Sequence, residues 1–466
     1  MLPVLISGSL EYGEKMHSKN DAAKFPPMGW NSYDYYNTMV KEEQVKANAD
    51  YMARNLKKYG WEYIVIDIQW SDPDAGSQNP KVQYIPFSKF CIDEYSRQIP
   101  APNRFPSSAG GKGFAPLAAY IHSLGLKFGI HIMRGIPRIC AHNHTRILGT
   151  DVTADMIANP FSISRWNGDM YGVDPSKKGA QEYYDSIFSL YASWGVDYVK
   201  VDDICNTNMY PNNPYSAEKE IEMIQKAIEN SGRPMVLSLS PGPAVIEKAW
   251  HLEKYANMWR ITDDFWDSWE LLKAMFERCE VWQNHVGPGC WPDCDMLPLG
   301  KVGACFECYG TREHTTNLTK DEQRTMMNLW CIFRSPLMIG AELTKLDDFT
   351  RELLTNDEVL SLTKNGVQAR LVSRSEGNAV WATRKADSTG TDDFYLALFN
   401  LSDEKQRVSI KVEEVLNTLA LAGNTGTDLT VRDLWLHKET VTIKSDGTLS
   451  AELAPHASVL LRIWEK

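Results

Sequence analysis

Two aspartates, each at the end of a strand-like run, are the residues best suited to chemistry. Asp202 lies in DYVKVDD, residues 197–203, and Asp264 lies in ANMWRITDDFWDSW, residues 256–269. Side chains two positions apart on a strand point the same way, so Lys200 and Asp202 are expected on one face. A lysine and a carboxylate are costly to hide in a core, whereas a pocket can use both.

The second run adds an arginine and aromatic rings to the acid. Arg260 precedes Asp264 by four positions in this run. Four aromatic residues flank the pair: Trp259, Phe265, Trp266 and Trp269. An acid, an arginine and flat aromatic faces are what a sugar-cleaving site needs. The alternative interpretation is that the two aspartates are salt-bridged strand ends with a structural role, since ion pairs also occur there.

The surrounding pattern predicts an α/β fold, a (β/α)8 TIM barrel over residues 26–362. Helix-like segments such as 42–60 and 178–195 have apolar positions at helical spacing and end in a glycine. They alternate with runs predicted to be strands, at 26–33, 63–70, 127–135, 196–203, 234–242, 258–264, 294–300 and 335–340. This alternation fits one barrel domain, preceded by an N-terminal extension at residues 1–25.

The carboxyl ends of barrel strands build the active site in this fold. Six polar residues fall at such ends: Asp67, His131, Asp202, Ser240, Asp264 and Asp295. They come from six different predicted strands, so we expect them to converge on one mouth of the barrel.

A second domain of antiparallel β-sandwich type is predicted over residues 363–466. Short segments with a period of two take over there, at 378–385, 393–402, 406–415, 429–437, 439–445 and 458–464. Turn-forming residues separate them, including 387–392 and 445–448.

Composition limits the classes of partner. The chain has 466 residues, 43% of them hydrophobic, and a net charge of −11. This charge argues against nucleic acid and anionic membranes as partners, and no apolar run reaches the length of about 18 residues that a membrane span needs. A carbohydrate substrate is the expected partner, and a homo-oligomer is compatible with the sequence.

The nine cysteines favour a reducing cytoplasm over a disulfide framework, because their number is odd and they are scattered. Residues 1–15 have too short an apolar stretch, and no basic lead, for a secretory signal. A mature form that has lost its signal is the alternative.

Two groups of residues could bind a metal ion. Cys290, Cys294, Cys305 and Cys308 form a C-x3-C-x10-C-x2-C array that a structural zinc could use. Four free thiols in a long loop are the favoured interpretation, because the first spacing is not a tight knuckle. His131, His142 and His144 invite a catalytic metal, yet they form no HExxH motif.

The chain resembles glycoside hydrolase family 27, the melibiase or α-galactosidase family, over essentially its whole length. The motifs that carry the resemblance are MGWNSY at 28–33, YIVIDIQW at 63–70, YVKVDD at 198–203, WRITDDFWDSW at 259–269 and WPDCDMLPLG at 291–300. The resemblance implies a retaining exo-glycosidase that needs no cofactor. It makes Asp202, not Asp203, the nucleophile and Asp264, not Asp263, the acid/base. Sugar contacts are expected from Trp30, Tyr33, Asp67, Ile68, His131, Lys200, Ser240, Arg260 and Asp295.

The chemistry of these residue types agrees with those roles. A retaining glycosidase uses two carboxyl groups, one to attack the anomeric carbon and one to protonate the leaving oxygen. The charge of Lys200 should lower the pKa of Asp202 and keep it ionised. The rings near Asp264 should favour its acid form by desolvation.

The chain departs from the family pattern at a position that should influence which terminal sugar it accepts. The second strand of family α-galactosidases typically carries paired aspartates, and this chain has Asp67-Ile68. Ile68 cannot accept a hydrogen bond from a hydroxymethyl group, but it can pack against a ring that lacks one. β-L-Arabinopyranose is α-D-galactopyranose without C6, so Ile68 favours terminal β-L-arabinopyranosyl residues. The alternative is an ordinary α-galactosidase that tolerates the change.

Other departures keep further interpretations open. Ser240 stands where α-galactosidases often have a glutamate, and a small residue there could admit the acetamido group of an α-N-acetylgalactosaminide. His131 replaces a frequent tyrosine, and Tyr33 a tryptophan. A metal-dependent barrel hydrolase and a non-catalytic sugar-binding protein are the candidates from other classes.

Overall fold

The computed structural model describes residues 19–85, 87–207, 212–386, 393–421 and 426–465. Most of the predicted N-terminal extension, and the turn predicted at 387–392, therefore lie outside the described residues. Residues Lys19–Ala23 form a 3-10 helix, η1. The carbonyl of Ala23 accepts hydrogen bonds from Gly289 N (2.9 Å) and from Trp291 Nε1 (2.7 Å), so this helix packs beneath the barrel.

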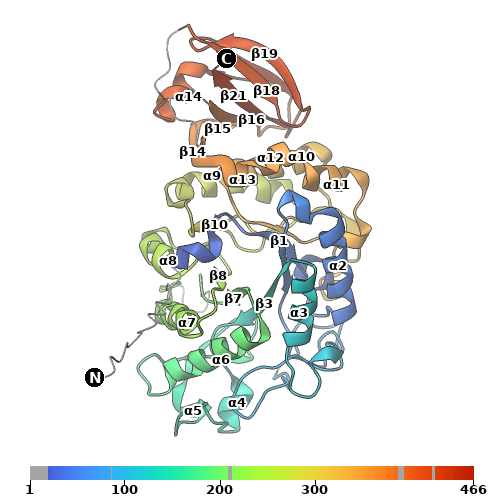
Figure 1. Ribbon diagram of the computed structural model, residues 1–466, viewed down its shortest axis with the longest axis vertical. Coiled ribbons are helices and arrows are strands. Elements are labelled where there is room, and N and C mark those ends of the chain that lie inside the picture. The colour runs from blue at the N-terminus through green and yellow to red at the C-terminus, as the bar shows by residue number, and fades with distance from the viewer. Residues whose placement is uncertain (1–18, 86, 208–211, 387–392, 422–425, 466) are drawn as a thin grey trace, which may run out of the picture.

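Eight parallel strands form the barrel, which confirms the predicted fold class (Figure 1). Their order is β10 (Trp291–Asp293), β9 (Met258–Arg260), β8 (Val236–Leu239), β7 (Tyr198–Asp202), β3 (Lys127–Met133), β2 (Tyr63–Ile66), β1 (Met28–Asn31) and β13 (Leu337–Ile339). The two edge strands meet through Leu297, which bridges to Ile339 and donates from its N–H to the carbonyl of Met338 at 2.7 Å.

Helices surround the strands, as the alternating pattern predicts. The longer ones are α2 (Glu42–Asn55), α3 (Ala115–Ser123), α6 (Ala180–Trp194), α7 (Glu218–Asn230), α8 (Ala249–Tyr255), α9 (Trp269–Trp282), α10 (Lys320–Phe333) and α11 (Asp348–Thr355). Short ones are α1 (Tyr33–Tyr36), α4 (Arg138–His142), α5 (Ala154–Ile157), α12 (Asp357–Leu360) and α13 (Leu362–Asn365). Gly195 ends α6 in the left-handed region at φ 83°, where glycine has no Cβ penalty.

Small sheets and single turns fill the connections between barrel strands. The strands are β4 (Ile136–Pro137), β5 (Ala158–Ile163), β6 (Met170–Val173), β11 (Lys301–Val302) and β12 (His314–Thr315). The 3-10 turns are η2 (Lys57–Tyr59), η3 (Pro106–Ser108), η4 (Ile246–Lys248), η5 (Gln283–His285), η6 (Glu307–Tyr309) and η7 (Leu343–Lys345).

Two predicted strands are wrong in their bounds. The seventh barrel strand was expected at 294–300, but β10 ends at Asp293 and the chain leaves the strand there, because Asp295 has φ 75°. Residues 406–415 were expected as one strand, yet β17 (Gln406–Lys411) gives way to α14 (Val412–Thr418). Val412, Val415 and Leu416 are buried at helical spacing in this segment.

The C-terminal part is the predicted antiparallel β-sandwich. A six-stranded sheet has the order β14 (Gly366–Arg374), β15 (Asn378–Lys385), β16 (Asp393–Asn400), β21 (Ser458–Glu465), β18 (Asp428–Asp433) and β19 (Lys438–Lys444). It shares a hydrophobic core with the pair β17 and β20 (Thr448–Leu453). The strands β14 and β20 were not anticipated.

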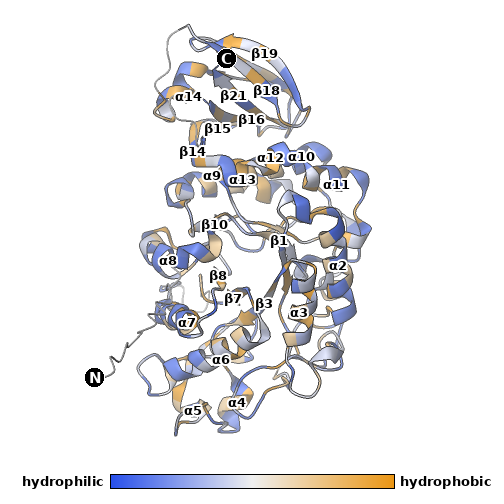
Figure 2. Ribbon diagram, in the orientation of Figure 1, coloured by the Kyte–Doolittle hydropathy of each residue, from blue (hydrophilic) through white to orange (hydrophobic). Residues whose placement is uncertain are grey.

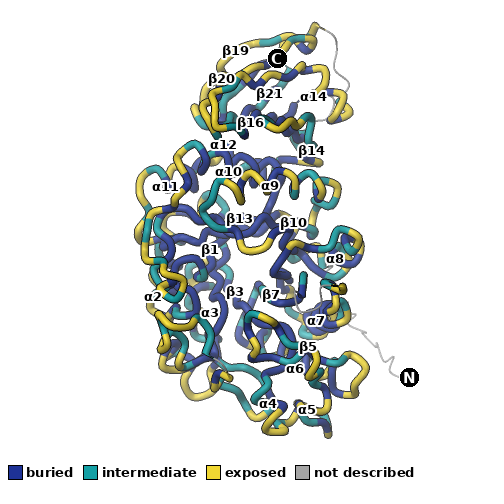
Figure 3. Tube along the Cα trace, turned by 180° about the vertical axis from the view of Figure 1, so that it is seen from behind, coloured by how far each residue is buried: buried dark blue, intermediate teal, exposed yellow. Residues whose placement is uncertain are grey.

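The sandwich is packed against the barrel rather than joined by a free linker. Every residue of β16 is buried, because one face of this strand meets the sandwich core and the other meets the barrel helices. Phe276 and Phe399 lie 4.9 Å apart across the junction, and Trp269 stacks on His456 at 3.8 Å. Seen from behind, the buried chain runs through the barrel and on into the junction with the sandwich (Figure 3).

The outward faces of the barrel helices are mostly hydrophilic (Figure 2). In the part of the chain that the structure describes, no helix combines the length and apolar character needed to cross a membrane.

Candidate active site

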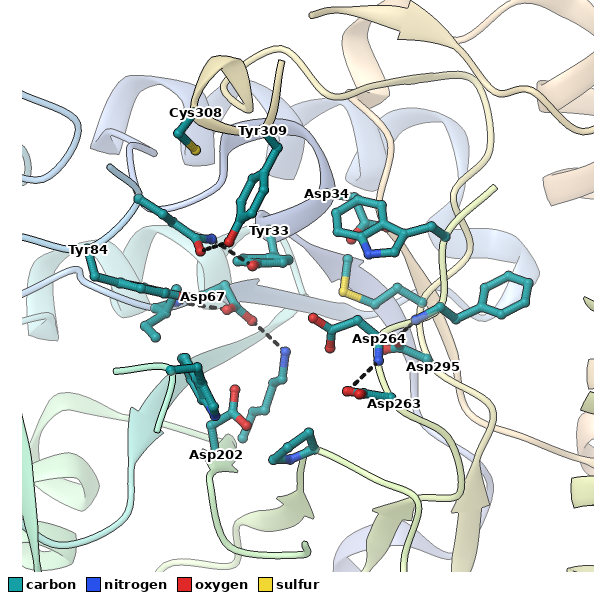
Figure 4. A pocket seen from close by; sticks show the side chains of 18 of the residues that line it. Tyr33, Asp34, Asp67, Tyr84, Asp202, Asp263, Asp264, Asp295, Cys308 and Tyr309 are labelled. Carbon is teal, nitrogen blue, oxygen red and sulfur yellow. Dashed lines mark hydrogen bonds and ion pairs between the residues drawn. The ribbon is translucent and has the colours of Figure 1, made fainter. Parts of the chain in front are cut away.

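A cavity of about 570 Å³ opens at the carboxyl ends of the barrel strands (Figure 4). Its walls combine buried charged groups with aromatic rings, in a size range typical of small-molecule sites. The lining residues are Tyr33, Asp34, Asp67, Ile68, Lys81, Val82, Gln83, Tyr84, Trp166, Lys200, Asp202, Pro241, Arg260, Asp263, Asp264, Phe265, Trp266, Asp295, Met296, Cys308 and Tyr309.

Asp67 is held as a carboxylate on one side of this cavity. Lys200 Nζ lies 2.9 Å from its Oδ2, Asn31 donates to the same oxygen at 2.7 Å, and Ile68 N donates to Oδ1 at 2.9 Å. Burial alone would raise the pKa of Asp67, but the charges of Lys200 and His131 and these hydrogen bonds hold it well below its usual range.

Asp202 receives two hydrogen bonds at the end of β7. The Nε2 of His131 lies 3.1 Å from its Oδ2, and the N–H of Asp203 donates to its Oδ1 at 2.9 Å. Burial acts to raise the pKa of Asp202, yet the bond from His131 and the charges of His131 and Lys200 outweigh it and lower this pKa. The carboxylate is therefore ionised at neutral pH, as the sequence led us to expect.

Arg260 joins the acidic residues of the opposite wall. Its Nη1 lies 2.8 Å from Asp295 Oδ1 and its Nη2 lies 3.1 Å from Asp264 Oδ1. Asp295 also accepts from the N–H of Phe265 at 2.8 Å. Both Asp202 and Asp264 project into the cavity, from the end of β7 and from the loop after β9 (Figure 4).

The expected desolvation of Asp264 is not found. Its side chain is 51% exposed, because the neighbouring Phe265 turns away to pack on Trp330 at 5.1 Å. Arg260, rather than an apolar enclosure, is the main partner of this carboxyl. Any desolvation of Asp264 must come from what binds in the cavity.

Asp67 and Ile68 both face the cavity although they are adjacent in sequence. Strand alternation would send them to opposite faces, but β2 ends at Ile66 and the chain turns, with Gln69 at φ 69°. Ile68 is 3% exposed and lies in an apolar cluster with Met133 and Met170. The cavity therefore has an apolar wall beside Asp67.

Three of the expected sugar contacts do not line the cavity. Trp30 is fully buried and donates from Nε1 to the carbonyl of Ala341 at 2.8 Å, so it belongs to the core. Ser240 is also buried, and its neighbour Pro241 faces the cavity instead. His131 lies behind Asp202 and orients it. Trp30, Ser240 and His131 therefore do not line this cavity, and a direct contact of any of the three with the sugar stays a prediction.

The adjacent aspartates of β7 separate into two environments. Asp202 lines the cavity, whereas Asp203 turns away at φ 54° and pairs with Arg134 at 2.9 Å. Arg134 also pairs with Glu220 at 3.1 Å and donates from its backbone N to the carbonyl of Asp202 at 3.1 Å. Burial above all raises the pKa of Asp203, to about 7. This network supports the turn that carries Asp202.

Several residues that line the cavity were not predicted from the sequence. Asp34 directly follows Tyr33 of the first motif, and that position was the only signal for it. Gln83 connects two lining rings, because it accepts from Tyr309 Oη at 2.6 Å and donates to Tyr33 Oη at 2.8 Å. The loops that carry Gln83, Tyr84, Trp166 and Tyr309 have no periodicity that would predict their positions.

The four cysteines of the zinc hypothesis lie apart. Cys290 contacts Lys19, at 3.8 Å, and Cys294 faces Cys279, at 3.6 Å. Cys305 and Cys308 lie beside Asn37. Among the described residues, the group with metal-ligand spacing is Glu218, Glu222 and His251, which includes none of these cysteines and neither His142 nor His144. These three side chains line no part of the cavity.

Comparison with known proteins agrees with this geometry. The family model "Alpha galactosidase A" matches residues 176–365, and the model "Alpha galactosidase C-terminal beta sandwich domain" matches residues 375–463. An α-galactosidase from Cyamopsis tetragonoloba is 26% identical over 443 residues, which cover 94% of this chain and 86% of that protein.

Two proteins of solved structure are more similar to this chain in sequence than the Cyamopsis tetragonoloba enzyme is. A GH27 β-L-arabinopyranosidase from Geobacillus stearothermophilus is 51% identical, with 96% of this chain and 97% of that chain covered and a TM-score of 0.89. A variant of that enzyme was crystallised in complex with arabinose. A Bacillus halodurans protein, provisionally described as an α-N-acetylgalactosaminidase, is 48% identical, with coverages of 95% and 97% and a TM-score of 0.82.

We expect Arg134→Met to destabilise the fold strongly. The Arg134, Asp203 and Glu220 side chains are only 2%, 3% and 7% exposed, and removing one partner of a buried ion pair leaves an uncompensated charge at a cost of about 3–5 kcal/mol. The free energy of unfolding in urea measures this. The matched control is Arg146→Met, whose pair with Glu94 is 64% exposed on both sides and should contribute about 0–1 kcal/mol. Equal losses in both variants would contradict the assigned role of the network.

Proposed function

The chain belongs to glycoside hydrolase family 27, and on that premise we propose that it is a retaining exo-glycosidase that removes terminal β-L-arabinopyranosyl residues. The observation that carries the sugar assignment is Ile68, an apolar wall next to Asp67. The similarity to the Geobacillus stearothermophilus β-L-arabinopyranosidase supports it. The second candidate is an α-galactosidase, which the curated relatives favour. The sequence argument for an α-N-acetylgalactosaminidase was that the small side chain of Ser240 could admit an acetamido group. Ser240 is buried and does not line the cavity, so this argument no longer supports that activity.

Asp202 is the nucleophile in this proposal. It attacks the anomeric carbon and forms a glycosyl-enzyme, which water then hydrolyses with net retention of configuration. The lowered pKa of Asp202 supports this role, because an ionised carboxylate is the attacking species. His131 donates to the oxygen Oδ2 and fixes the direction of the other oxygen.

Asp264 is the acid and then the base. It protonates the departing oxygen in the first step and takes a proton from water in the second. Its half-exposed side chain sits where a leaving group can cover it, and that cover would supply the desolvation that favours the acid form. Arg260 holds the carboxyl in position at 3.1 Å.

The remaining charged groups bind the sugar hydroxyls. Asp67 and Asp295 offer carboxylate oxygens, and Lys200 and Arg260 offer N–H donors, all within one cavity. Lys200 sits between Asp67 and Asp202, so it can hold a hydroxyl of the same ring that Asp202 attacks. A ring without a hydroxymethyl group presents a CH2 to Ile68.

Rates on three p-nitrophenyl glycosides test the proposal. We expect kcat/KM for the β-L-arabinopyranoside to exceed that for the α-D-galactopyranoside by at least about tenfold, with the α-N-acetylgalactosaminide slowest. A higher value for the galactoside would move the assignment to α-galactosidase. No turnover of any of the three would remove the proposed substrate class.

Asp264→Ala should slow poor leaving groups far more than activated ones. Only a poor leaving group needs a proton, and general acid catalysis contributes roughly 10²–10⁴-fold. We expect a loss of this size in kcat/KM on an alkyl arabinopyranoside and a smaller loss on a 2,4-dinitrophenyl glycoside. Asp263→Ala is the matched control, because Asp263 lines the cavity without contacting Arg260 through its side chain. Equal losses on both substrates would argue against Asp264.

His131→Phe should shift the acid limb of the pH profile upward. The hydrogen bond from His131 lowers the pKa of Asp202, so its loss raises that pKa and protonates the nucleophile at a higher pH. We expect kcat/KM at pH 4–5, relative to its value at pH 7, to fall in the variant. His122→Phe removes another histidine–aspartate pair, with Asp197 just before β7, and should leave the limb in place. An unshifted limb in His131→Phe would count against the orienting role.

Ile68→Asp should move the preference toward α-galactosides. The new carboxylate can accept from O6–H, and a charged hydrogen bond contributes about 1.5–3 kcal/mol, or roughly ten- to a hundredfold. Against a bare ring CH2 the same carboxylate loses hydration without a partner. The ratio of kcat/KM values on the two p-nitrophenyl substrates measures the change, and Ile68→Val is the apolar control. A ratio that stays at the wild-type value in Ile68→Asp would remove the main support for arabinopyranoside.

A further inference from the structure

Asp34 is a buried carboxyl group that lines the cavity without a partner of its own. The residue is 4% exposed. Within the described residues, its Oδ2 receives no hydrogen bond. Of the three cations that line the cavity, Lys81 is exposed, Lys200 pairs with Asp67, and Arg260 pairs with Asp264 and Asp295. Buried polar groups are nearly always hydrogen-bonded, so an exception of this kind calls for an explanation.

The backbone is arranged to leave room for this carboxyl. Asp34 stands in α1, directly after β1, and its carbonyl accepts from Gly303 N at 2.8 Å. Gly340 follows the end of β13, where a Cβ would overlap the carboxyl oxygen of Asp34. The oxygen Oδ2 is thus packed against the backbone at Gly340, and Oδ1 is the carboxyl oxygen left to the cavity.

The surroundings of Asp34 favour its neutral form. Burial, and after it the charge of Asp295, raise the pKa of Asp34 well above its usual range, although the charge of Lys200 opposes them. Asp34 lies on the same side of the cavity as Asp264 and Asp295 (Figure 4). A protonated carboxyl has one O–H donor and one carbonyl acceptor. A sugar hydroxyl has the same complement, so it can bond to Oδ1 as donor or as acceptor.

We propose that Asp34 is a substrate-binding residue that exchanges hydrogen bonds with a ring hydroxyl of the terminal sugar. The inference rests on the proposed glycosidase function and adds a polar contact on the wall opposite Asp67. An unpaired buried carboxyl weakens the free protein. Such a group is retained where binding needs it, as is typical of functional sites.

The opposed effects of Asp34→Leu on stability and catalysis test this proposal first. Leucine removes both polar atoms and keeps similar bulk, so we expect an unchanged or higher thermal midpoint together with a fall of at least about tenfold in kcat/KM on the p-nitrophenyl β-L-arabinopyranoside. Asp34→Asn keeps one donor and one acceptor and should recover part of the rate. A lowered midpoint in both variants, with a proportionate loss of activity, would mean that Asp34 is structural and would overturn the proposal.

Substrates that lack one ring hydroxyl group show which hydroxyl of the sugar contacts Asp34. We expect one of the 2-, 3- and 4-deoxy p-nitrophenyl β-L-arabinopyranosides to lose at least about tenfold in kcat/KM with the wild type and less than about threefold with Asp34→Leu, as coupled partners do in a double-mutant cycle. Tyr35→Phe is the control on the same helix, because Tyr35 bonds to Glu313 outside the cavity, and it should show the wild-type penalties. Identical penalties in wild type and Asp34→Leu would overturn the proposal.

Binding of the free sugar separates this proposal from the proposed function. If the wild type hydrolyses none of the glycosides, the proposed function fails, and Asp34 is judged by calorimetry with free L-arabinose and its deoxy analogues. A weaker Kd for L-arabinose in Asp34→Leu, with the penalty of one deoxy analogue lost, supports the contact. Equal Kd values in wild type and variant would overturn it.

Discussion

Two cations, the buried Arg260 and the partly buried Lys200, compensate the charge of a cavity that many carboxyl groups line. Lys200 lies 2.9 Å from Asp67, and Arg260 lies 2.8 Å from Asp295 and 3.1 Å from Asp264. Charges of one sign cannot gather in a buried space unless opposite charges or protons compensate them. The protein uses both means: His131 and Lys200 together lower the pKa values of Asp67 and Asp202, while burial, and after it the charge of Asp295, raises the pKa of Asp34 well above its usual range.

This balance depends on a rigid support behind the cavity. Arg134 pairs with Asp203 and Glu220 and also donates from its backbone to the carbonyl of Asp202. The network joins the end of β3 to the end of β7 and to α7, so that Asp202 and its neighbour His131 keep a defined relation. The position of Asp202 in the cavity is therefore set by buried ion pairs outside the cavity as much as by the groups inside it.

One wall of the cavity is apolar, and the opposite wall has a carboxyl group without a hydrogen-bond partner among the described residues. Ile68, with Met133 and Met170 behind it, offers no hydrogen bond on the side of Asp67. Asp34 offers a carboxyl without a partner on the opposite wall. The proposed ligand, a pyranose without a hydroxymethyl group, would present a hydrocarbon face to one wall and hydroxyl groups to the other. Specificity of this kind comes from unmet hydrogen bonds as well as from shape.

The sequence alone determined the barrel, the sandwich and the four predicted aspartates that line the cavity, Asp67, Asp202, Asp264 and Asp295. Strand alternation, helical spacing and glycine ends are local properties, so the pattern around β7 and α6 could be read directly. The ends of β10 and β17 could not be predicted in this way. The backbone turn at Asp295 and the helix that follows Lys411 depend on packing. Likewise, only the tertiary structure decided that Trp30 and Ser240 belong to the core, that the turn after β2 brings Ile68 beside Asp67, and that Asp34 lines the cavity. Which way a side chain faces at the end of a strand depends on contacts with residues hundreds of positions away, and no local pattern contains them.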